Sequence, residues 1–220
     1  MLRCNVCGNS KFQNGPGGRV SQGGSLPACE SCGSLERHRI VRAVWKPLIG
    51  LDLSRLKAIQ FSLDPSVDRD WFRSLEISIY GERNSLDLES MDRPSDTFDV
   101  VICNHVLEHV RDDRQAFREI IRILKPTGLF QFTVPLPQTR AVTEEWGYPD
   151  HPHGHYRLYG RDLVDRFGAA SPGTRFLCVP GVDPVTREPD LVYFAFLDER
   201  RLEWVRRSLS KAFRSVKVAA

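Results

Sequence analysis

The stretch from Phe98 to Pro135, FDVVICNHVLEHVRDDRQAFREIIRILKPTGLFQFTVP, constrains the fold more than any other part of the chain. The apolar run Phe98–Cys103 predicts a buried strand, and Leu129–Val134 predicts a second. Between them, Asp112–Lys125 carries apolar residues at i, i+3, i+4 and i+7, the spacing of one helical face. This β-loop-α-β order indicates an open α/β sheet, in which ligands bind at the carboxyl ends of the strands.

The rest of the chain continues this alternation. We expect strands at 56–62, 77–80, 98–103, 129–134, 175–179 and 191–197, a short strand around 85–88, and helices at 34–48, 65–75, 112–125, 160–167 and 198–216. The short, turn-rich connection Pro180–Asp190 allows the last two strands to pair antiparallel. The sequence therefore predicts an α/β fold with a mostly parallel, Rossmann-like sheet and one antiparallel strand near the C-terminus.

Four cysteines precede this α/β region in two C-x2-C pairs, Cys4 with Cys7 and Cys29 with Cys32. Four thiolates at this spacing can surround one tetrahedral zinc ion. The segment between the pairs is rich in glycine, serine and proline and supplies little core, so it needs a metal to become ordered. Two disulfides or free thiols are the alternatives, and a reducing compartment disfavours the disulfides.

These patterns divide the chain into a zinc ribbon at 1–34, a linking helix at 35–50 and an α/β domain at 51–220. The net charge of +3 over 220 residues is too close to neutral to indicate a polyanionic partner. The sequence contains no run of 18 apolar residues and no apolar signal core at its N-terminus. We therefore expect a cytoplasmic protein with neither a membrane nor a nucleic acid as partner.

The segments FDVVICNHVLEHV and LKPTGLFQFTVP resemble the second half of class I S-adenosylmethionine-dependent methyltransferases. The chain is most similar to a bacterial group of these enzymes that carries an N-terminal zinc ribbon. CGSLERHR (Cys32–Arg39) and HYRLYGRDL (His155–Leu163) resemble segments of that group. The resemblance implies a class I methyltransferase sheet, S-adenosylmethionine as cofactor, and methyl transfer to oxygen or nitrogen of a small-molecule substrate.

The resemblance also implies cofactor-binding residues. In the family the first strand ends in a glycine-rich loop, whereas the corresponding region here reads IQFSLDPSV, without glycine. Asp64 is the candidate partner of the cofactor's ammonium group, and Ser62 can supply a hydrogen bond. Glu82 and Asp87 are the candidates for the ribose and adenine contacts, although only four residues separate them where the family has a helix and a strand.

Asn104 and His105 follow the strand at 98–103, where the resemblance places the methyl donor, so we expect both to contact the cofactor and His105 to act in catalysis. His155 is the second catalytic candidate, because a neutral imidazole can take a proton from a hydroxyl or an amine. With His151 and His153 it forms an H-x-H-x-H pattern. Such a pattern can bind a divalent ion, but ordinary loop histidines are the more frequent explanation.

Two other functions remain open. The missing glycines and the shortened region before residue 87 are compatible with a methyltransferase-like fold that binds a ligand or scaffolds a partner without catalysis. A zinc ribbon can also bind nucleic acid, although this one has few basic residues (Arg3, Lys11 and Arg19). The sequence names neither the methyl acceptor nor the oligomeric state, because substrate contacts in such folds come from loops outside the common core.

Overall fold

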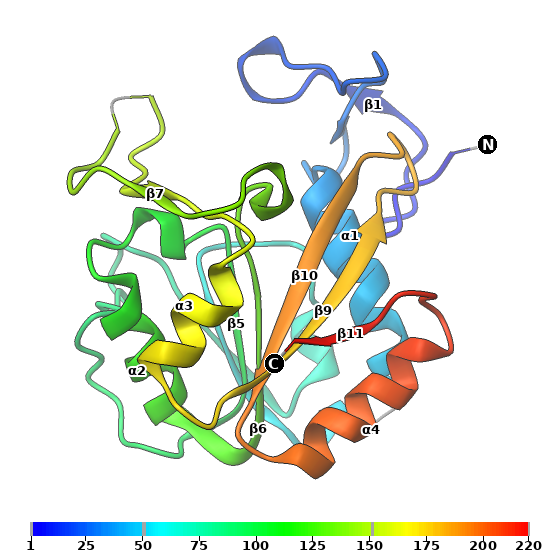
Figure 1. Cartoon of the computed structure of the whole chain (residues 1–220). Helices are drawn as coiled ribbons and strands as arrows, with labels where there is room; N and C mark the ends of the chain where they lie inside the picture. Colours follow the sequence, from blue (N-terminus) through cyan, green and yellow to red (C-terminus); the bar gives the residue numbers. More distant parts are fainter. Residues whose placement is uncertain (1, 50–51, 151, 220) are drawn as a thin grey trace.

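A seven-stranded sheet forms the centre of the structure, a computed structural model that describes residues 2–49, 52–150 and 152–219 (Figure 1). Its strands are β3 (Lys57–Phe61), β4 (Ser74–Ser78), β5 (Phe98–Asn104), β6 (Leu124–Thr133), β9 (Arg175–Val182), β10 (Pro189–Phe196) and β11 (Lys217–Ala219), in the order β11-β9-β10-β6-β5-β3-β4. Four neighbouring strands, β4, β3, β5 and β6, pair in parallel, and β10 runs antiparallel to both β6 and β9. The predicted Rossmann-like, mostly parallel sheet is confirmed, with β10 as its antiparallel strand. The short edge strand β11 adds a second antiparallel strand.

Helices cover both faces of this sheet (Figure 1). The α-helices are α1 (Glu36–Trp45), α2 (Asp113–Ile123), α3 (Leu163–Ala170) and α4 (Glu199–Ser210), and the 3-10 helices are η1 (Pro16–Gly18), η2 (Lys46–Leu48), η3 (Leu53–Arg55), η4 (Arg69–Trp71), η5 (Leu107–His109) and η6 (Pro137–Thr139). α2 and α3 share a core with one face of the sheet, while α1 and α4 share a core with the other. No helix in the described ranges is long and apolar enough to cross a membrane.

The core on the α2 side contains the apolar residues that the helical spacing singles out. Phe117 of α2 is fully buried and stacks on Phe167 of α3 with ring centroids 4.6 Å apart. α2 begins after Asp112, whose carboxylate accepts a hydrogen bond from the Gln115 amide at 2.9 Å. An acidic N-cap of this kind satisfies one of the amides that the first helical turn leaves unpaired. Local capping and a periodic apolar face therefore agree on this helix.

Helix α1 does more than connect the ribbon to the sheet, because its last residue is part of the core. Trp45 is fully buried, and its ring lies edge-on to Phe72 and to Phe194, each at 6.0 Å between centroids. Its indole nitrogen donates a hydrogen bond to Gln131 of β6 at 3.2 Å. The interval between the predicted linking helix and the α/β domain, residues 50 and 51, lies outside the described residues.

Three predicted elements differ from the structure. The helix expected at 65–75 is reduced to the 3-10 turn η4, and β4 already begins at Ser74. Phe72 packs on α1, which already covers this part of the sheet, so no helix is needed there. The strand expected at 85–88 is a loop, held by a hydrogen bond from the Leu86 amide to Ser78 Oγ at 3.0 Å. The last helix ends at Ser210, since the chain turns back and Lys217–Ala219 pairs with β9.

The N-terminal ribbon lies at the edge of the sheet where the parallel strands end (Figure 1). It contains the two-stranded pair β1 (Phe12–Gln13) and β2 (Ala28–Cys29). A buried ion pair fastens α1 to the β9–β10 hairpin, because Arg39 donates to both carboxylate oxygens of Asp183, at 2.7 and 2.8 Å. The same guanidinium donates to the Ser34 carbonyl at 2.7 Å. The ribbon is therefore held firmly beside the carboxyl edge of the sheet.

Candidate functional site

The four ribbon cysteines meet at one point. The Sγ atoms of Cys4, Cys7, Cys29 and Cys32 all lie within 4.8 Å of one another, with 3.8 Å between Cys4 and Cys32 and 3.5 Å between Cys7 and Cys29. Sulfurs bound tetrahedrally to one zinc at 2.3 Å would be about 3.8 Å apart. The four thiols thus have both the chemistry and the spacing of a structural zinc site. The other two cysteines lie elsewhere: Cys103 is buried in β5, and Cys178 is half-buried in β9.

The segment after the last of these cysteines directs its polar side chains to different partners. Ser34 does not cap α1: its hydroxyl lies 3.1 Å from Cys4 Sγ, while His38 Nδ1 accepts the Leu35 amide at 3.0 Å. Glu36 binds Arg19 of the ribbon at 2.8 and 2.7 Å. Arg37 has no hydrogen-bond or ion-pair partner among the described residues. It points to a different place, the carboxyl edge of the sheet.

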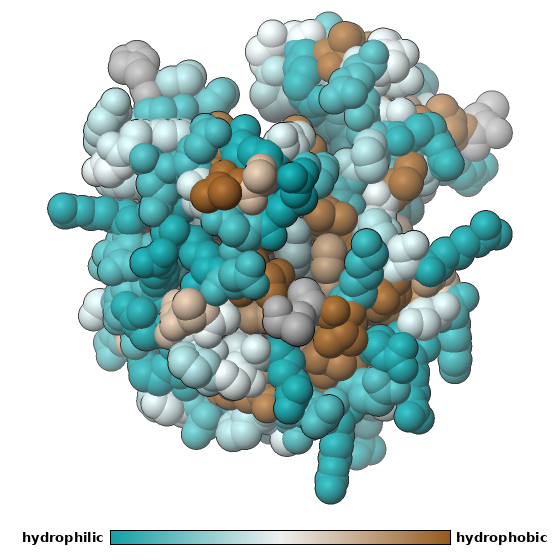
Figure 2. All heavy atoms as spheres, viewed as in Figure 1, coloured by the Kyte–Doolittle hydropathy of each residue, from teal (hydrophilic) through white to brown (hydrophobic). Residues whose placement is uncertain are grey.

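Polar side chains from five segments gather at this edge, where β3 and β5 end. We call them the carboxyl-edge cluster: Arg37, Asp64, Asn104, His105, Glu108 and His155. Charges on Asp64 and Glu108 act on the pKa of Arg37, and charges on Arg37 and His155 act on the pKa of His105. Figure 2 shows a notch on this side of the molecule, between the ribbon and the segment that carries β7 (Glu144–Glu145) and β8 (Arg157–Leu158).

Buried polar atoms without partners concentrate in and beside this cluster. Nine such side-chain atoms occur in the described parts of the chain, and six of them are Gln60 Oε1, Asn104 Nδ2, His105 Nε2, both Glu108 carboxylate oxygens and His155 Nδ1. Native proteins pair nearly all their buried polar groups. A group of unpaired atoms at the ligand-binding end of an α/β sheet therefore marks a place for a ligand.

Burial and neighbouring charges shift the titration of the two central groups. Glu108 is almost fully buried, and burial raises its pKa to about 8, against opposing effects from its own amide and from Arg37 and Arg157. Burial also holds the pKa of His105 well below its usual value, and the charges on Arg37 and His38 lower it further. Both side chains are therefore uncharged at neutral pH.

The residues predicted to follow the first strand lie in the turn after β3. Ser62 adopts a left-handed backbone conformation, with φ of 68°, and donates its amide to the Ser78 carbonyl at 2.8 Å. It thus takes, as a serine, a backbone conformation that favours glycine. Asp64 is buried, and its carboxylate accepts hydrogen bonds from both the amide and the hydroxyl of Ser66.

The residues predicted after β5 are also at this edge. Asn104 Oδ1 accepts hydrogen bonds from Gln131 at 2.7 Å and from Thr133 at 3.1 Å, which fixes the amide and leaves Nδ2 without a partner. His105 has a φ of 53°, and its Nδ1 lies 3.7 Å from a Glu108 oxygen. Asn104 and His105 are thus held rigidly beside the Asp64 turn.

Glu82 and Asp87 are the predicted residues that the structure does not bring into the cluster. Both are exposed in the irregular segment after β4. The Glu82 amide closes a turn on the Ile79 carbonyl at 3.1 Å, and the Asp87 carboxylate accepts the Glu89 amide at 2.9 Å. Within the described residues, no hydrogen bond or ion pair joins either acid to the carboxyl-edge cluster.

The predicted site residues included neither Arg37 nor Glu108. Arg37 lies in the segment CGSLERHR, which carries part of the family resemblance, so the sequence contained a signal for this residue. The resemblance does not indicate where the side chain of Arg37 points. Glu108, absent from the predicted site residues, is one of the most buried charged residues. Gln60 is a polar residue within the apolar strand KAIQF, and that contrast is the signal that could have found it.

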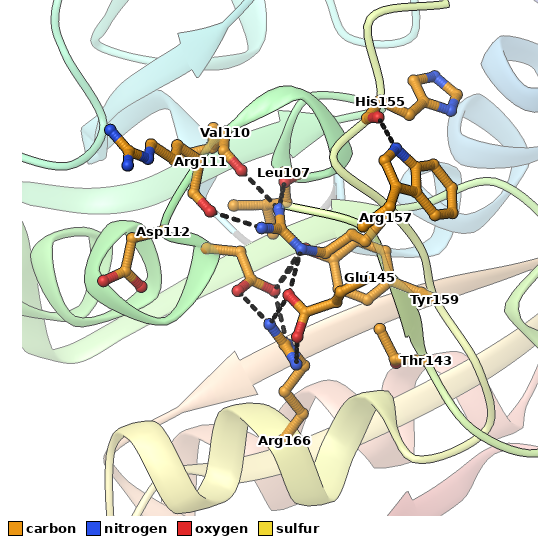
Figure 3. A network of polar contacts seen from close by, with 12 residues as sticks. Leu107, Val110, Arg111, Asp112, Thr143, Glu145, His155, Arg157, Tyr159 and Arg166 are labelled. Carbon is orange, nitrogen blue, oxygen red and sulfur yellow. Dashed lines mark hydrogen bonds and ion pairs between the residues drawn. The ribbon is translucent and has the colours of Figure 1, made fainter. Parts of the chain in front are cut away.

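The segment HYRLYGRDL fastens the loop that carries His155 (Figure 3). Arg157 is buried and donates to the carbonyls of Leu107 at 3.0 Å, Val110 at 2.5 Å and Arg111 at 2.6 Å, while also binding Glu145 at 3.0 Å. Its charge therefore stabilises the end of η5 and is not free for a substrate.

Of the three loop histidines, His151 lies outside the described residues. His153 is exposed, with its ring centroid 5.3 Å from that of His155. The nearer neighbour of His155 is His109 of η5, at 4.6 Å between ring centroids. The structure thus places His155 against η5 as well as against its own loop.

Residues 31–170 match the family model described as a methyltransferase domain, and they make up more than half of the chain. The chain therefore belongs to this family of methyltransferase domains.

Known proteins extend the likeness. The uncharacterized methyltransferase YcgJ of Bacillus subtilis is 43% identical over 42 residues, which are 19% of this chain and 17% of that protein. A S-adenosylmethionine-dependent methyltransferase of Thermotoga maritima, described as a possible histamine N-methyltransferase, is 12% identical over 72% of this chain and 89% of its own, with a TM-score of 0.45. The trans-methyltransferase CalH, solved with SAH, is 13% identical over 72% of this chain and 58% of its own, with a TM-score of 0.44. These likenesses say nothing about the substrate of this chain.

Proposed function

We propose that this protein transfers a methyl group from S-adenosylmethionine to an oxygen or nitrogen atom of a small-molecule acceptor. The observation that carries this proposal is the group of six unpartnered, buried polar atoms in and beside the carboxyl-edge cluster. They lie where proteins with this type of sheet bind their ligands. Family membership supplies the reaction class, and the cluster supplies the place.

The cluster fits the amino-acid end of the cofactor. Asp64 and Arg37 carry opposite charges and influence each other, yet they form no ion pair. A zwitterion placed between them would match both, its ammonium group toward Asp64 and its carboxylate toward Arg37. Ser62 lines the same turn with backbone in the left-handed conformation. We assign these three residues to cofactor binding.

The ribose and adenine end would lie toward β4. Glu82 is the first acid after that strand and is exposed, so its carboxylate is free to accept ribose hydroxyls. Asp87 follows in the same segment, but its carboxylate already accepts a backbone amide. We therefore assign the ribose contact to Glu82 and the adenine contact to Asp87. This end of the site is the less completely formed of the two.

S-adenosylmethionine, when bound, supplies an electrophilic methyl group on sulfur. The chain's own part is to orient the acceptor and to remove its proton as the new bond forms. His105 is placed for the second task, because its Nε2 is buried and has no partner. Asn104 Nδ2 offers a fixed donor next to it. His155, the other predicted base, lies on the outer side of Glu108.

Calorimetric titration of the zinc-loaded protein with S-adenosylmethionine and with its demethylated product tests the cofactor site. We expect binding by the wild type and at least a tenfold loss for Asp64→Ala and for Arg37→Ala, since each removes one charge-assisted contact worth about 1.5–3 kcal/mol. Arg42→Ala is the matched control, because Arg42 lies on the same helix but pairs with Asp68 instead. A folded wild type that binds neither ligand would refute the proposal.

The role of His105 needs a separate measurement. His105→Gln keeps a polar side chain of similar reach but cannot take a proton at neutral pH. We expect it to retain cofactor binding, because glutamine can keep a polar contact to the cofactor, and to transfer methyl groups at least about 100-fold more slowly. The acceptor can be sought by offering pools of small hydroxyl and amine compounds with radiolabelled cofactor. Equal transfer rates for the variant and the wild type would remove His105 from catalysis.

A second candidate is a methyltransferase-like protein that binds or scaffolds without catalysis. Two observations favour it: the glycine-poor turn after β3, and the burial of Phe61 and Met91 in the core beside the segment after β4. Cofactor binding without methyl transfer to any acceptor would support this second function. For a nucleic-acid partner there is no comparable support, since Arg19 of the ribbon is already paired with Glu36.

A further inference from the structure

The carboxyl edge contains a second group of metal-ligating side chains, separate from the four cysteines. Glu108 and His109 belong to η5, and His155 comes from the loop before β8. Their ligand atoms all lie within 4.8 Å of one another. Ligands around one zinc ion are at most about 4 Å apart, twice the usual metal–ligand distance. A contraction of less than about 1 Å would therefore bring all three onto one ion.

The Glu108 carboxylate is the strongest evidence that this group of side chains binds a cation. Both of its oxygens are buried, and neither has a hydrogen-bond partner among the described residues. A buried carboxyl without partners is costly, and proteins that keep one usually pair it or bind a metal with it. His155 Nδ1 is a second buried atom without a partner, and it belongs to the same group. A cation between them would satisfy both.

His109 has the orientation that metal-binding histidines commonly show. Its Nδ1 lies 3.2 Å from the Gly154 carbonyl, which can only accept, so Nδ1 carries the proton. Nε2 is then the nitrogen with the free lone pair. A hydrogen bond from the other ring nitrogen to a backbone carbonyl fixes the tautomer and orientation of a metal ligand. The supporting contact is thus already present in this structure.

The backbone around the three residues is fixed by contacts that do not involve their side chains. The Tyr156 amide donates to the Glu108 carbonyl at 2.8 Å, which ties the loop directly to η5. Trp146 Nε1 donates to the His155 carbonyl at 2.9 Å. Arg157 holds the η5 carbonyls from the other side. Two segments some 50 residues apart are therefore held together where the three ligands meet.

We propose that Glu108, His109 and His155 form a second metal site, which binds a divalent first-row transition-metal ion through one carboxylate and two imidazoles. This donor set suits zinc, iron or manganese, whereas the ribbon offers only thiolates. Three protein ligands leave coordination positions open, and His109 is on the exposed side of the group. An oxygen or nitrogen of the methyl acceptor would occupy an open position, a role that rests on the proposed function, whereas metal binding itself does not.

The proposed metal site differs from one formed by the histidines of the H-x-H-x-H pattern. Of the two described histidines of that pattern, His155 belongs to the group and His153 does not, and the partners of His155 come from η5. His153 is exposed and outside the group, although it is a histidine two residues away in the same loop. It therefore provides a matched control. His153→Asn removes an imidazole from the loop and should leave the metal site intact.

Equilibrium dialysis of the full-length protein against Co²⁺, with zinc and cobalt counted together by elemental analysis, tests the proposal without cofactor or acceptor. The wild type and His153→Asn should hold one metal per chain more than Glu108→Gln and His155→Asn do. Each of the latter two should bind the extra ion at least about 100-fold more weakly, since even supporting residues contribute 10–100-fold. The result is a difference between variants, so it does not depend on how fully the ribbon is loaded.

The visible spectrum of the bound Co²⁺ distinguishes the two sites. Cobalt at Glu108, His109 and His155 should show only d–d bands, whereas cobalt in the ribbon adds thiolate charge-transfer absorption. Circular dichroism and thermal melting show that the variants are folded, and without a metal ion at this site Glu108→Gln is expected to melt no lower than the wild type, because it removes a buried, unpaired carboxyl. Equal metal content in the wild type and both ligand variants, or an extra ion lost with His153→Asn alone, would overturn the proposal.

Discussion

The buried pair between Arg39 and Asp183 should be the most sensitive single contact between the N-terminal part and the sheet. Both side chains are completely buried, and Asp183 also accepts the amide and the hydroxyl of Thr186, each at 2.8 Å. Asp183→Ala removes the side-chain hydrogen-bond acceptors of Arg39 and leaves its charge buried, with the Ser34 carbonyl as its remaining hydrogen-bond acceptor. Breaking a buried pair in this way costs about 3–5 kcal/mol.

Urea denaturation at pH 7 measures this loss. The matched control is Asp68→Ala, which breaks the pair between Asp68 and Arg42 on the same helix, where Asp68 is about half exposed (48%). We expect a loss of less than about 1 kcal/mol for the control. The double variant Arg39→Met, Asp183→Leu should recover most of the stability, because paired apolar side chains can replace a buried ion pair. A loss for Asp183→Ala no larger than that for the control would refute the reasoning.

The same pair has a defined pH dependence. Burial by itself raises the pKa of Asp183, but the hydrogen bonds from Arg39 and the Thr186 amide outweigh it and lower the pKa. A carboxyl whose pKa is lowered in the folded state contributes stability above its unfolded pKa of about 3.9, and loses it as the pH falls through the folded value. The difference between wild type and Asp183→Ala should therefore shrink below about pH 4.

Three further predictions concern packing, metal and pH. Gly160→Ala should lower the free energy of unfolding by about 1–3 kcal/mol, because a Cβ there would lie 2.4 Å from the Val142 carbonyl carbon. Gly168→Ala inside α3 has room for the methyl group and should raise it by up to about 1 kcal/mol. Chemical denaturation compares the two variants. Chelation of the ribbon zinc should make residues before α1 sensitive to protease while the sheet stays resistant, as mass spectrometry of the fragments would show. Burial raises the pKa of Asp190 to about 6, against the Leu191 amide and Arg37. Stability is then lost as the pH rises toward 6, so Asp190→Asn should gain stability over the wild type between pH 4 and 7, measured by melting.

The elements with strong local signals could be predicted from the sequence. The strand at Phe98, the helix of Phe117 and the final hairpin each have a clear apolar period and a cap or turn. Their positions were correct to within a few residues, except that β6 begins earlier than expected, at Leu124. The sequence could not indicate that residues 65–75 lack the predicted helix. The absence of that helix depends on α1, a segment from elsewhere in the chain that packs against Phe72.

By itself the sequence determined the fold class, the family and the four clustered cysteines that could hold zinc, since periodicity and ligand spacing are properties of short segments. Only the tertiary structure decided which polar side chains share the carboxyl edge. Arg37 points there because Arg39, two residues on, is anchored to Asp183, and His155 meets Glu108 because Arg157 fastens their two segments together. Direction and burial of this kind come from contacts between distant segments. Glu82 and Asp87, which the sequence predicts for the ribose and adenine contacts, lie exposed in the irregular segment after β4.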